Sequence, residues 1–405
     1  MERSELTIYS KMINFLLLPL FWFSYFLPKK RNLWVFGAWF GERYSDNSQY
    51  LFEYVCKKYP HINAIWMTKS KNTTEEHQAN GYMAKLINSL RGYFITATAE
   101  VVVLTNGYSD VNRFGLARSN IFQLWHGIPL KKIKKDDIIN ENKKSLSKNI
   151  LKRINPLFNE KYSLAFAQSK TDQKRFASAF SMEIENVKIT GSARDDIILL
   201  EQNKIGSEFP MQIDDRKRKI LFAPTFRQSI NSIFSSLTND IIEKLSTILK
   251  KYNAELLINA HYADKTEKLK QTLVGDKYPI YLIDNESIDI NKLLPQIDVL
   301  LTDYSSIYFD YLQLNRPIIF TSFDVVEYQQ QEREFYDDYI QVTPGEKANN
   351  WIDIVEYLEN ILQGNDNYSD ARKKLNSKLH VYQDSSNCER VINEINNYIG
   401  DNNGK

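Results

Sequence analysis

The chain has 405 residues, of which 43% are hydrophobic and 25% charged, and its 52 basic and 50 acidic side chains leave a net charge of +2. This composition is ordinary for globular proteins and excludes a collagen-like, coiled-coil or wholly disordered chain. The length predicts two or three domains. Cys56 and Cys388 lie far apart and outside any CxxC motif, which excludes a zinc ribbon and a disulfide scaffold. The near-neutral charge gives no sign of a nucleic-acid partner.

An apolar stretch near the N-terminus, residues 12–27, precedes the basic cluster Lys29-Lys30-Arg31. It is shorter than the roughly 20 residues that a membrane-spanning helix needs, and its basic residues follow the apolar core, unlike those of a signal peptide. We therefore expect residues 1–31 to form a monotopic membrane-associating segment, with Trp22 and Tyr25 near the lipid headgroups. A helix that packs on its own domain is the alternative.

Short apolar runs then alternate with helical patterns, which is typical of parallel sheets covered by helices on both faces. The first half predicts strands at 33–36, 64–68, 101–105, 121–125 and 164–168, and helices at 49–58 and 89–98. The second half predicts strands at 220–223, 255–260, 280–283, 299–302 and 318–321, and helices at 238–252, 266–273, 290–294 and 307–312.

A polar segment, residues 205–219, contains Gly206 and Pro210 and predicts a domain boundary. The expected fold is α/β, with two Rossmann-type domains at 32–205 and 216–390 and a ligand cleft between them. Residues 391–405 are expected to form the end of a C-terminal helix and a frayed tail.

One local segment is strongly basic although the whole chain is not. Residues 130–153 carry nine bases against three acids, a local charge of +6. Such a patch attracts anionic lipid or a polyanionic acceptor. A solvated helix face or a surface loop explains it equally well.

Two histidines directly follow predicted strands. His126 lies in QLWHGIPLKKI, where Gly127 allows the backbone to approach a ligand closely, and His261 lies at the matching place of the second half, in LLINAHY. In doubly wound sheets ligands bind outside the carboxyl ends of the strands. Because histidine is the natural general base near pH 7, both are candidate catalytic residues. The alternative is that each is a hydrogen-bonded structural histidine.

A further strand end carries serines. Asp303-Tyr304-Ser305-Ser306 follows the strand 299–302 and precedes a helix. Hydroxyls, free N–H groups and the positive dipole end together make a phosphate site, so Asp303, Ser305 and Ser306 are candidate substrate-binding residues. A plain helix N-cap is the alternative.

Arginines could add phosphate contacts. In FAPTFR, Thr225 and Arg227 follow the first strand of the second half, and Arg194 lies in GSARDD. A guanidinium can bind phosphate through two parallel hydrogen bonds, although a surface arginine explains Arg227 as well. Asp324 and Arg333 lie in a polar, aromatic-rich segment that suits a sugar or a base.

Several common motifs are absent from the sequence. It contains no GxGxxG after a strand, no P-loop, no GxSxG and no HExxH, and no tight acidic cluster that indicates a divalent metal. We therefore expect neither a metal nor a cofactor, and catalysis by histidines, helix N-termini and arginines.

Five segments, in this order, resemble the CDP-glycerol glycerophosphotransferase family, whose members are primases and polymerases of bacterial teichoic acid and related capsule polymers. They are WHGIPLKKI, GSARDD, FAPTFR, NAH and TDYSSIYFDYLQLNRPIIF, and the resemblance covers about residues 33–390. It implies a GT-B-like fold, monotopic association with the cytoplasmic face of the bacterial membrane, and transfer of glycerol phosphate from CDP-glycerol to a hydroxyl with release of CMP. The implied acceptor is a prenyl-diphosphate-linked saccharide or polyol phosphate.

The resemblance also implies roles for single residues. His126 matches the proposed base and His261 the histidine that contacts the pyrophosphate, while Ser305 and Ser306 match the phosphate-binding serines and Arg227 the arginine of the family's APT[WF]R motif.

The sequence departs from the family pattern at several positions. Ile128 stands where the family usually has threonine, and Asn259 where it often has a basic residue. A CDP-ribitol donor therefore stays open. Two further functions also stay open: a GT-B glycosyltransferase that uses a sugar nucleotide, and a non-catalytic membrane adaptor.

Overall fold

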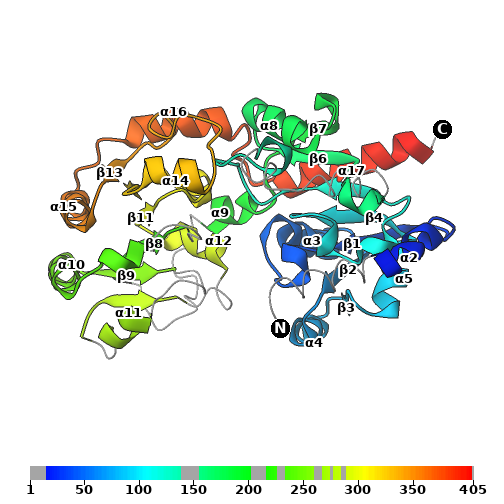
Figure 1. Cartoon of the computed structure of the whole chain (residues 1–405), viewed down its shortest axis with the longest axis horizontal. Helices are drawn as coiled ribbons and strands as arrows, with labels where there is room; N and C mark the ends of the chain where they lie inside the picture. The colour runs from blue at the N-terminus through cyan, green and yellow to red at the C-terminus, as the bar shows by residue number, and fades with distance from the viewer. Residues whose placement is uncertain are drawn as a thin grey trace.

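The computed structural model describes residues 15–137, 155–201, 216–225, 233–259, 267–273, 277–283 and 289–403. Each half of the chain is built around one sheet, and every strand pair in both sheets is parallel (Figure 1). This confirms the expected α/β class with two parallel sheets.

The first sheet has seven strands in the order β3-β2-β1-β4-β5-β6-β7. Its first six strands follow the 3-2-1-4-5-6 order of Rossmann folds, so the sheet reverses direction of winding between β1 and β4. The strands are β1 (Lys30–Phe36), β2 (Asn63–Thr68), β3 (Ala84–Leu86), β4 (Ala99–Leu104), β5 (Asn120–Gln123), β6 (Leu164–Ala167) and β7 (Val187–Ile189). The helices of this part of the chain are α2 (Leu18–Ser24), α3 (Asp46–Lys58), α4 (Lys71–Ala79), α5 (Leu90–Thr98), α8 (Lys170–Phe180) and α9 (Asp195–Glu201).

The second sheet has six strands in the order β10-β9-β8-β11-β12-β13, which repeats the same winding with its reversal between β8 and β11. The strands are β8 (Arg218–Ala223), β9 (Ala254–Ile258), β10 (Ile280–Leu282), β11 (Val299–Thr302), β12 (Ile318–Thr321) and β13 (Glu346–Ala348). The helices are α10 (Asn239–Lys251), α11 (Glu267–Thr272), α12 (Ile290–Leu293), α13 (Ile307–Tyr311), α14 (Val325–Gln331), α15 (Trp351–Leu362), α16 (Ser369–Leu379) and α17 (Asn387–Asn403).

Helix starts follow local capping chemistry. The side chains of Ser70, Ser89, Ser169 and Thr238 each accept a hydrogen bond from a backbone N–H three residues further on. Each bond satisfies one of the N–H groups that a helix start leaves free. The expected helices at 89–98 and 238–252 are thereby confirmed, with their first residues acting as caps.

The last helix, α17, belongs to the first half and not to the second. Cys388, Val391, Ile392 and Ile395 are buried in the core that covers the first sheet, and the Tyr398 ring packs 5.8 Å from that of Phe122. Figure 1 shows this helix lying along the first half. The expected helix end after residue 391 is therefore part of α17, whose side chains complete a hydrophobic core of the first half.

Helix α9, near the end of the predicted first domain, contacts both halves. Helix α9 falls within the predicted first domain, yet its Ile198 is fully buried in a core cluster built mostly of second-half residues. The Asp196 carboxylate then caps α17 by accepting the backbone N–H groups of Asn387 and Cys388, each at 2.9 Å. Helix α9 therefore contacts both halves.

Helix α2 packs one face on the first half. Leu17, Leu18 and Phe21 lie against its core, and the Tyr93 hydroxyl donates to the carbonyl of Leu20 at 2.7 Å. No helix within the described residues is long and apolar enough to cross a bilayer.

The burial of α17 makes a stability prediction. Ile392→Ala should lower the free energy of unfolding by about 2–5 kcal/mol, because it leaves a cavity in the first core. Ile352→Ala, at an exposed position of α15, should change it by no more than about 0.5 kcal/mol. Urea unfolding of both variants checks this, and equal small effects would contradict the placement of α17.

Candidate functional site

His126 lies on a sharp turn at the carboxyl end of β5. The strand ends at Gln123, and Trp125 (φ 55°) and Gly127 (φ 112°) both adopt positive φ, which reverses the chain around the histidine. The predicted strand 121–125 is therefore shorter than expected. A Cβ on residue 127 would lie 2.2 Å from Nη2 of Arg194, so only glycine fits there.

Aromatic rings hold the His126 imidazole. It stacks on Trp125 with ring centroids 4.0 Å apart, and the Trp39 ring lies at 5.6 Å. Its Nδ1 lies 3.3 Å from the carbonyl oxygen of Thr105, at the end of the neighbouring strand β4. The side chain is half-buried.

These surroundings keep His126 neutral. Burial lowers its pKa to about 4, and the nearby cations Arg194 and Lys134 add to the decrease, while the Asp46 carboxylate and the Thr105 carbonyl oppose it. A pKa this far below 7 leaves the ring unprotonated at neutral pH, which is the form that can accept a proton.

Arg194 lies beside this turn but is buried, and it pairs with carboxylates. Nη1 lies 2.9 Å from Asp46 at the start of α3, and Nη2 lies 2.6 Å from Asp310 on α13 of the second half. A phosphate contact of Arg194 stays a prediction, and it requires one of these ion pairs to exchange. In the described structure Arg194 joins the two halves next to His126.

The segment that follows His126 pairs with the second half along its backbone. Lys131 forms an antiparallel bridge with Phe335, the N–H of Lys132 donates to the carbonyl of Glu334 at 2.8 Å, and the N–H of Tyr336 donates to that of Leu130 at 3.0 Å. We call these paired segments, residues 130–137 and 333–337, the seam.

Side chains reinforce the seam. Lys132 pairs with Glu334 at 2.7 Å, the Tyr336 hydroxyl donates to Asp136 at 2.6 Å, and predicted site residue Arg333 lies 3.6 Å from Asp137.

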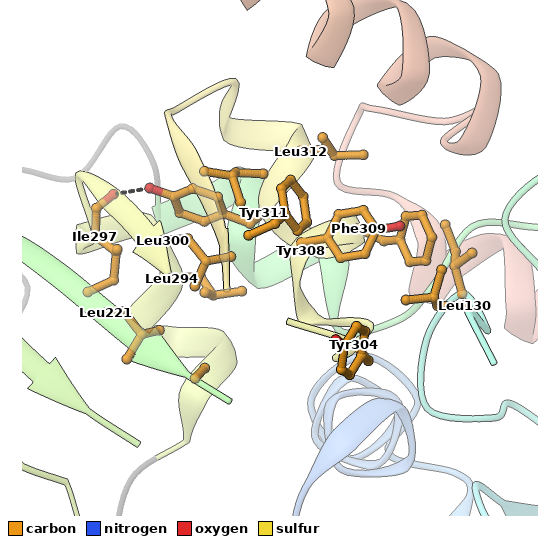
Figure 2. Packing of buried hydrophobic residues seen from close by; sticks show 14 of the residues in the cluster. Leu130, Leu221, Leu294, Ile297, Leu300, Tyr304, Tyr308, Phe309, Tyr311 and Leu312 are labelled. Carbon is orange, nitrogen blue, oxygen red and sulfur yellow. Dashed lines mark hydrogen bonds between the residues drawn. The ribbon is translucent and has the colours of Figure 1, made fainter. Parts of the chain in front are cut away.

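Apolar packing also joins the strand ends of the two halves. Ile128 and Leu130 share one buried cluster with Tyr304, Tyr308 and other second-half residues. Figure 2 shows Leu130 beside Tyr308 and Phe309. The turn carrying His126 and the segment carrying the serines therefore anchor in the same core.

The predicted serine motif follows β11. Ser305 and Ser306 are half-buried, and Ser306 is the N-cap residue of α13, although its hydroxyl makes no capping bond. The Ser305 hydroxyl accepts the N–H of Ile307 at 3.4 Å. Phosphate binding by these serines stays a prediction.

The neighbouring Asp303 supports this segment from inside. It is fully buried, and its Oδ1 accepts the N–H of Thr225 at 2.8 Å and that of Tyr304 at 2.6 Å. This places Thr225 and Asp303 where the second sheet reverses its winding. Asp303 therefore shapes the loop from within, and its direct contact with substrate stays a prediction. Asp324 accepts the Tyr304 hydroxyl at 2.8 Å.

Two predicted site residues and most of the basic segment fall outside the part of the chain that the structure describes. His261, Arg227 and residues 138–153 lie outside the described residues. The basic residues of the described part contact the protein itself, such as Lys134 with Glu160 at 2.9 Å and Lys135 with the Ser181 hydroxyl at 2.6 Å. Among the residues described, no group of three or more His, Cys, Asp or Glu side chains could hold a metal ion.

Sequence analysis missed two acids that shape the surroundings of His126. Asp46 opens α3 with a φ of 69° and accepts Trp39 Nε1 at 3.2 Å as well as Arg194. Asp110 is fully buried and accepts backbone N–H groups of the loop after β4. The sequence TNGYSD, which ends in Asp110 and directly follows a strand as His126 does, could have indicated Asp110.

The Arg194 ion pairs make a testable prediction. Arg194→Met should lower the free energy of unfolding by about 3–5 kcal/mol, because it strands Asp46 and Asp310 as buried charges. Arg333→Met removes a half-exposed pair and should cost about 0–1 kcal/mol. Urea unfolding compares the two, and equal losses would show that the Arg194 network does not stabilise the fold.

Comparison with solved structures identifies the fold. The wall teichoic acid polymerase TagF superposes with a TM-score of 0.72 at 20% identity, covering 99% of this chain and 98% of that one. A putative UDP-N-acetylglucosamine 2-epimerase from Listeria monocytogenes gives a TM-score of 0.58 at 13% identity, covering 91% of this chain and 97% of that one. At such identities the likeness concerns the fold.

Sequence comparison identifies the relatives. The teichoic acid glycerol-phosphate transferase of Staphylococcus aureus (strain NCTC 8325 / PS 47) is 27% identical over 381 residues, covering 91% of this chain and 94% of that protein. The teichoic acid glycerol-phosphate primase of Bacillus subtilis (strain 168) is 27% identical over 321 residues, 77% of each chain. The chain spans about half of the teichoic acid poly(glycerol phosphate) polymerase of Staphylococcus epidermidis, 50% of its length at 24% identity.

The family model described as CDP-glycerol:poly(glycerophosphate) glycerophosphotransferase matches residues 20–397, which extends the resemblance at both ends. The chain belongs to this glycerophosphotransferase family.

Proposed function

We propose that this glycerophosphotransferase moves glycerol phosphate from CDP-glycerol to a hydroxyl of a lipid-linked acceptor at the cytoplasmic face of the bacterial membrane, in teichoic acid or capsule polymer synthesis. The relatives named for glycerol-phosphate transfer support the donor. The observation that carries the proposal is a neutral imidazole, that of His126, on a turn whose neighbours anchor in the second half.

The reaction needs one proton transfer and one exchange at phosphorus. His126 takes the proton of the acceptor hydroxyl while that oxygen forms a bond to the glycerol-bearing phosphorus. The bond from this phosphorus to the bridging oxygen breaks, CMP leaves with its electron pair, and the imidazolium then returns the proton to solvent. Ser305, Ser306, His261 and Arg227 balance the developing charge on the leaving phosphate.

A GT-B-like arrangement fits a site in which one half binds the acceptor and the other half binds the donor. Both sheets share the Rossmann strand order, and their reversal points lie at the loops that carry Thr105 and Asp303. The acceptor would approach the His126 side and CDP-glycerol the Ser305 side, in a cleft between the halves. No metal or cofactor enters this scheme.

Removing the base tests the mechanism. His126→Ala should bind CDP-glycerol with an unchanged Kd and lose turnover by about 10²–10⁴-fold, which is the usual contribution of a general base. The measurement is CMP release with a defined prenyl-diphosphate-linked acceptor, with calorimetry for donor binding. Wild-type turnover in this variant would remove the base assignment.

The pH dependence of turnover in the same assay tests whether His126 must be unprotonated to act. Because the base must be unprotonated, kcat/KM should stay level from about pH 8 to about pH 5 and fall below that, following the His126 pKa of about 4 in the free enzyme. A bound diphosphate adds negative charge near the ring and raises its pKa, so the acidic limb of kcat should lie at higher pH than that of kcat/KM.

Replacing CDP-glycerol with other nucleotide donors in the same assay tests which donor the enzyme uses. CDP-glycerol should release CMP in the presence of acceptor, and CDP-ribitol and sugar nucleotides should not. Preference for CDP-ribitol would move the chain to the ribitol-phosphate enzymes, one of which is 26% identical over 407 residues. Release of a nucleotide only from sugar donors would overturn the proposal.

The proposed membrane contact rests on an apolar face that packing leaves open. Phe15, Leu16, Trp22, Phe23 and Phe26 of the α2 region are exposed, Phe26 to 81%. Leu90 and Phe94 on the neighbouring helix α5 are exposed as well, and Arg91 and Arg118 lie beside them at the surface. Such a face suits burial among acyl chains with arginines at anionic headgroups.

Point variants test the membrane contact without disturbing the packed side of α2. Phe23→Ser with Phe26→Ser should lower partition into vesicles that contain anionic lipid by at least about ten-fold, because two apolar rings no longer leave water. Phe158→Ser, an exposed phenylalanine outside α2 and α5, is the matched control. Unchanged sedimentation of the double variant would refute the contact.

A further inference from the structure

The surroundings of His126 select one of its two neutral forms. Its Nδ1 lies 3.3 Å from the Thr105 carbonyl oxygen, and a carbonyl can only accept a hydrogen bond. A neutral imidazole has one N–H, so a bond to Thr105 requires that proton on Nδ1. Nε2 is then left with its lone pair.

The direction of the Thr105 carbonyl is fixed by the Thr105–Asn106 peptide unit, which is hydrogen-bonded to Asp110. The N–H of Asn106 donates to Asp110 Oδ2 at 2.7 Å. In a planar trans peptide the C=O of residue 105 points opposite to the N–H of residue 106. Because the N–H points at Asp110, the carbonyl must point away from it, toward His126.

Asp110 holds more than one peptide of this loop. Its Oδ2 also accepts the N–H groups of Thr105 at 3.0 Å and Gly107 at 3.2 Å, and its Oδ1 accepts that of Phe40 at 2.7 Å. The residue is fully buried. A Cβ on Gly37, at the end of β1, would lie 2.2 Å from the Asp110 carbonyl oxygen, so the two strand-end loops are in close contact.

Other contacts keep the loop from rotating. Asn106 Oδ1 accepts the N–H of Trp39 at 3.0 Å, and Lys134 Nζ donates to the Asn106 carbonyl at 2.9 Å. Asp46, whose negative charge raises the pKa of the His126 imidazole, is bound by Arg194 and by Trp39 Nε1. It therefore does not compete for Nδ1 in any contact that the structure records.

We infer that Asp110 is a positioning residue for His126: through the Thr105–Asn106 peptide it fixes the imidazole in the Nδ1–H form and leaves Nε2 as the proton acceptor. This rests on the proposed role of His126 as base. A carboxylate that acts through one peptide unit orients the ring without placing a second negative charge in contact with it.

The direct test reads the proton position by ¹⁵N NMR of the histidine-labelled full-length protein near pH 7. The chain has five histidines, and His126→Gln assigns the relevant signal. The expected result is His126 protonated on Nδ1. A proton on Nε2 in the wild-type protein would overturn the inference.

The variant test is Asp110→Asn, in which an amide donor would face backbone N–H donors and release the loop. We expect kcat to fall by roughly 10–100-fold, KM for CDP-glycerol to stay unchanged, and the His126 signal to show both neutral forms. Asp172→Asn is the control, because Asp172 is equally buried and its Oδ2 accepts the N–H of Gln168, in the loop after β6. Wild-type kcat and an unchanged signal in Asp110→Asn would overturn the inference.

If Asp110→Asn does not fold, Asn106→Ala tests the same loop by removing the Oδ1 that accepts Trp39 N–H. It should also populate the Nε2–H form, and a purely Nδ1–H signal together with wild-type kcat would count against the loop as the orienting device. The NMR measurement needs no substrate. Wild-type turnover in His126→Ala would therefore remove the base assignment and leave the Nδ1–H form of the ring untouched, whereas an Nε2–H wild-type protein would overturn the positioning role of Asp110 and leave the proposed function standing.

Discussion

The Arg194 guanidinium lies where three parts of the chain converge: the start of α3, the turn after β5 and helix α13 of the second half. It is almost fully buried, and so are its partners Asp46 and Asp310. Such a cluster adds little net stability compared with apolar residues of the same volume, but it penalises any arrangement in which one partner is missing. Its effect is therefore to specify a relative position of the two halves, with the Gly127 turn held against the guanidinium.

The seam extends this constraint away from the buried charge. Backbone hydrogen bonds join segments 130–137 and 333–337 directly after the His126 turn. Ile128 and Leu130 also share one buried apolar cluster with Tyr304 and Tyr308, which follow β11. The proposed base and the proposed phosphate-binding serines thus lie on segments whose neighbours pack on each other. Phosphoryl transfer depends mainly on positioning and electrostatics, and a site divided between two sheets needs such cross-links to keep its geometry.

The long apolar runs predicted the central strands of both sheets, because a strand buried on both faces needs a continuous apolar sequence. Strands β3, β7 and β13 were missed, since each is three residues long with a lysine at its centre, whereas the equally short but apolar β10 was found. The spacing of Cys388, Val391, Ile392 and Ile395 is that of a buried helix stripe, so α17 was recognisable as core, although not which sheet it covers.

The candidate site divides in the same way. His126 was found because it follows a strand directly, and position along the chain is enough for that. Asp46 and Asp110 were missed because their importance comes from contacts with Arg194 and with the Thr105–Asn106 peptide, which only the folded chain brings together. Trp125 was assigned to the strand because hydrophobic periodicity carries no information on its positive φ.

The return of α17 to the first half has a consequence for biosynthesis. While the ribosome is still translating the second half, the first sheet lacks the helix that covers part of its apolar surface, although every strand of that sheet has already emerged. The usual sequence, in which an N-terminal domain matures before the next one is made, therefore does not apply in full. The nascent first half therefore stays partly uncovered until residues 387–403 have been made and can pack on it.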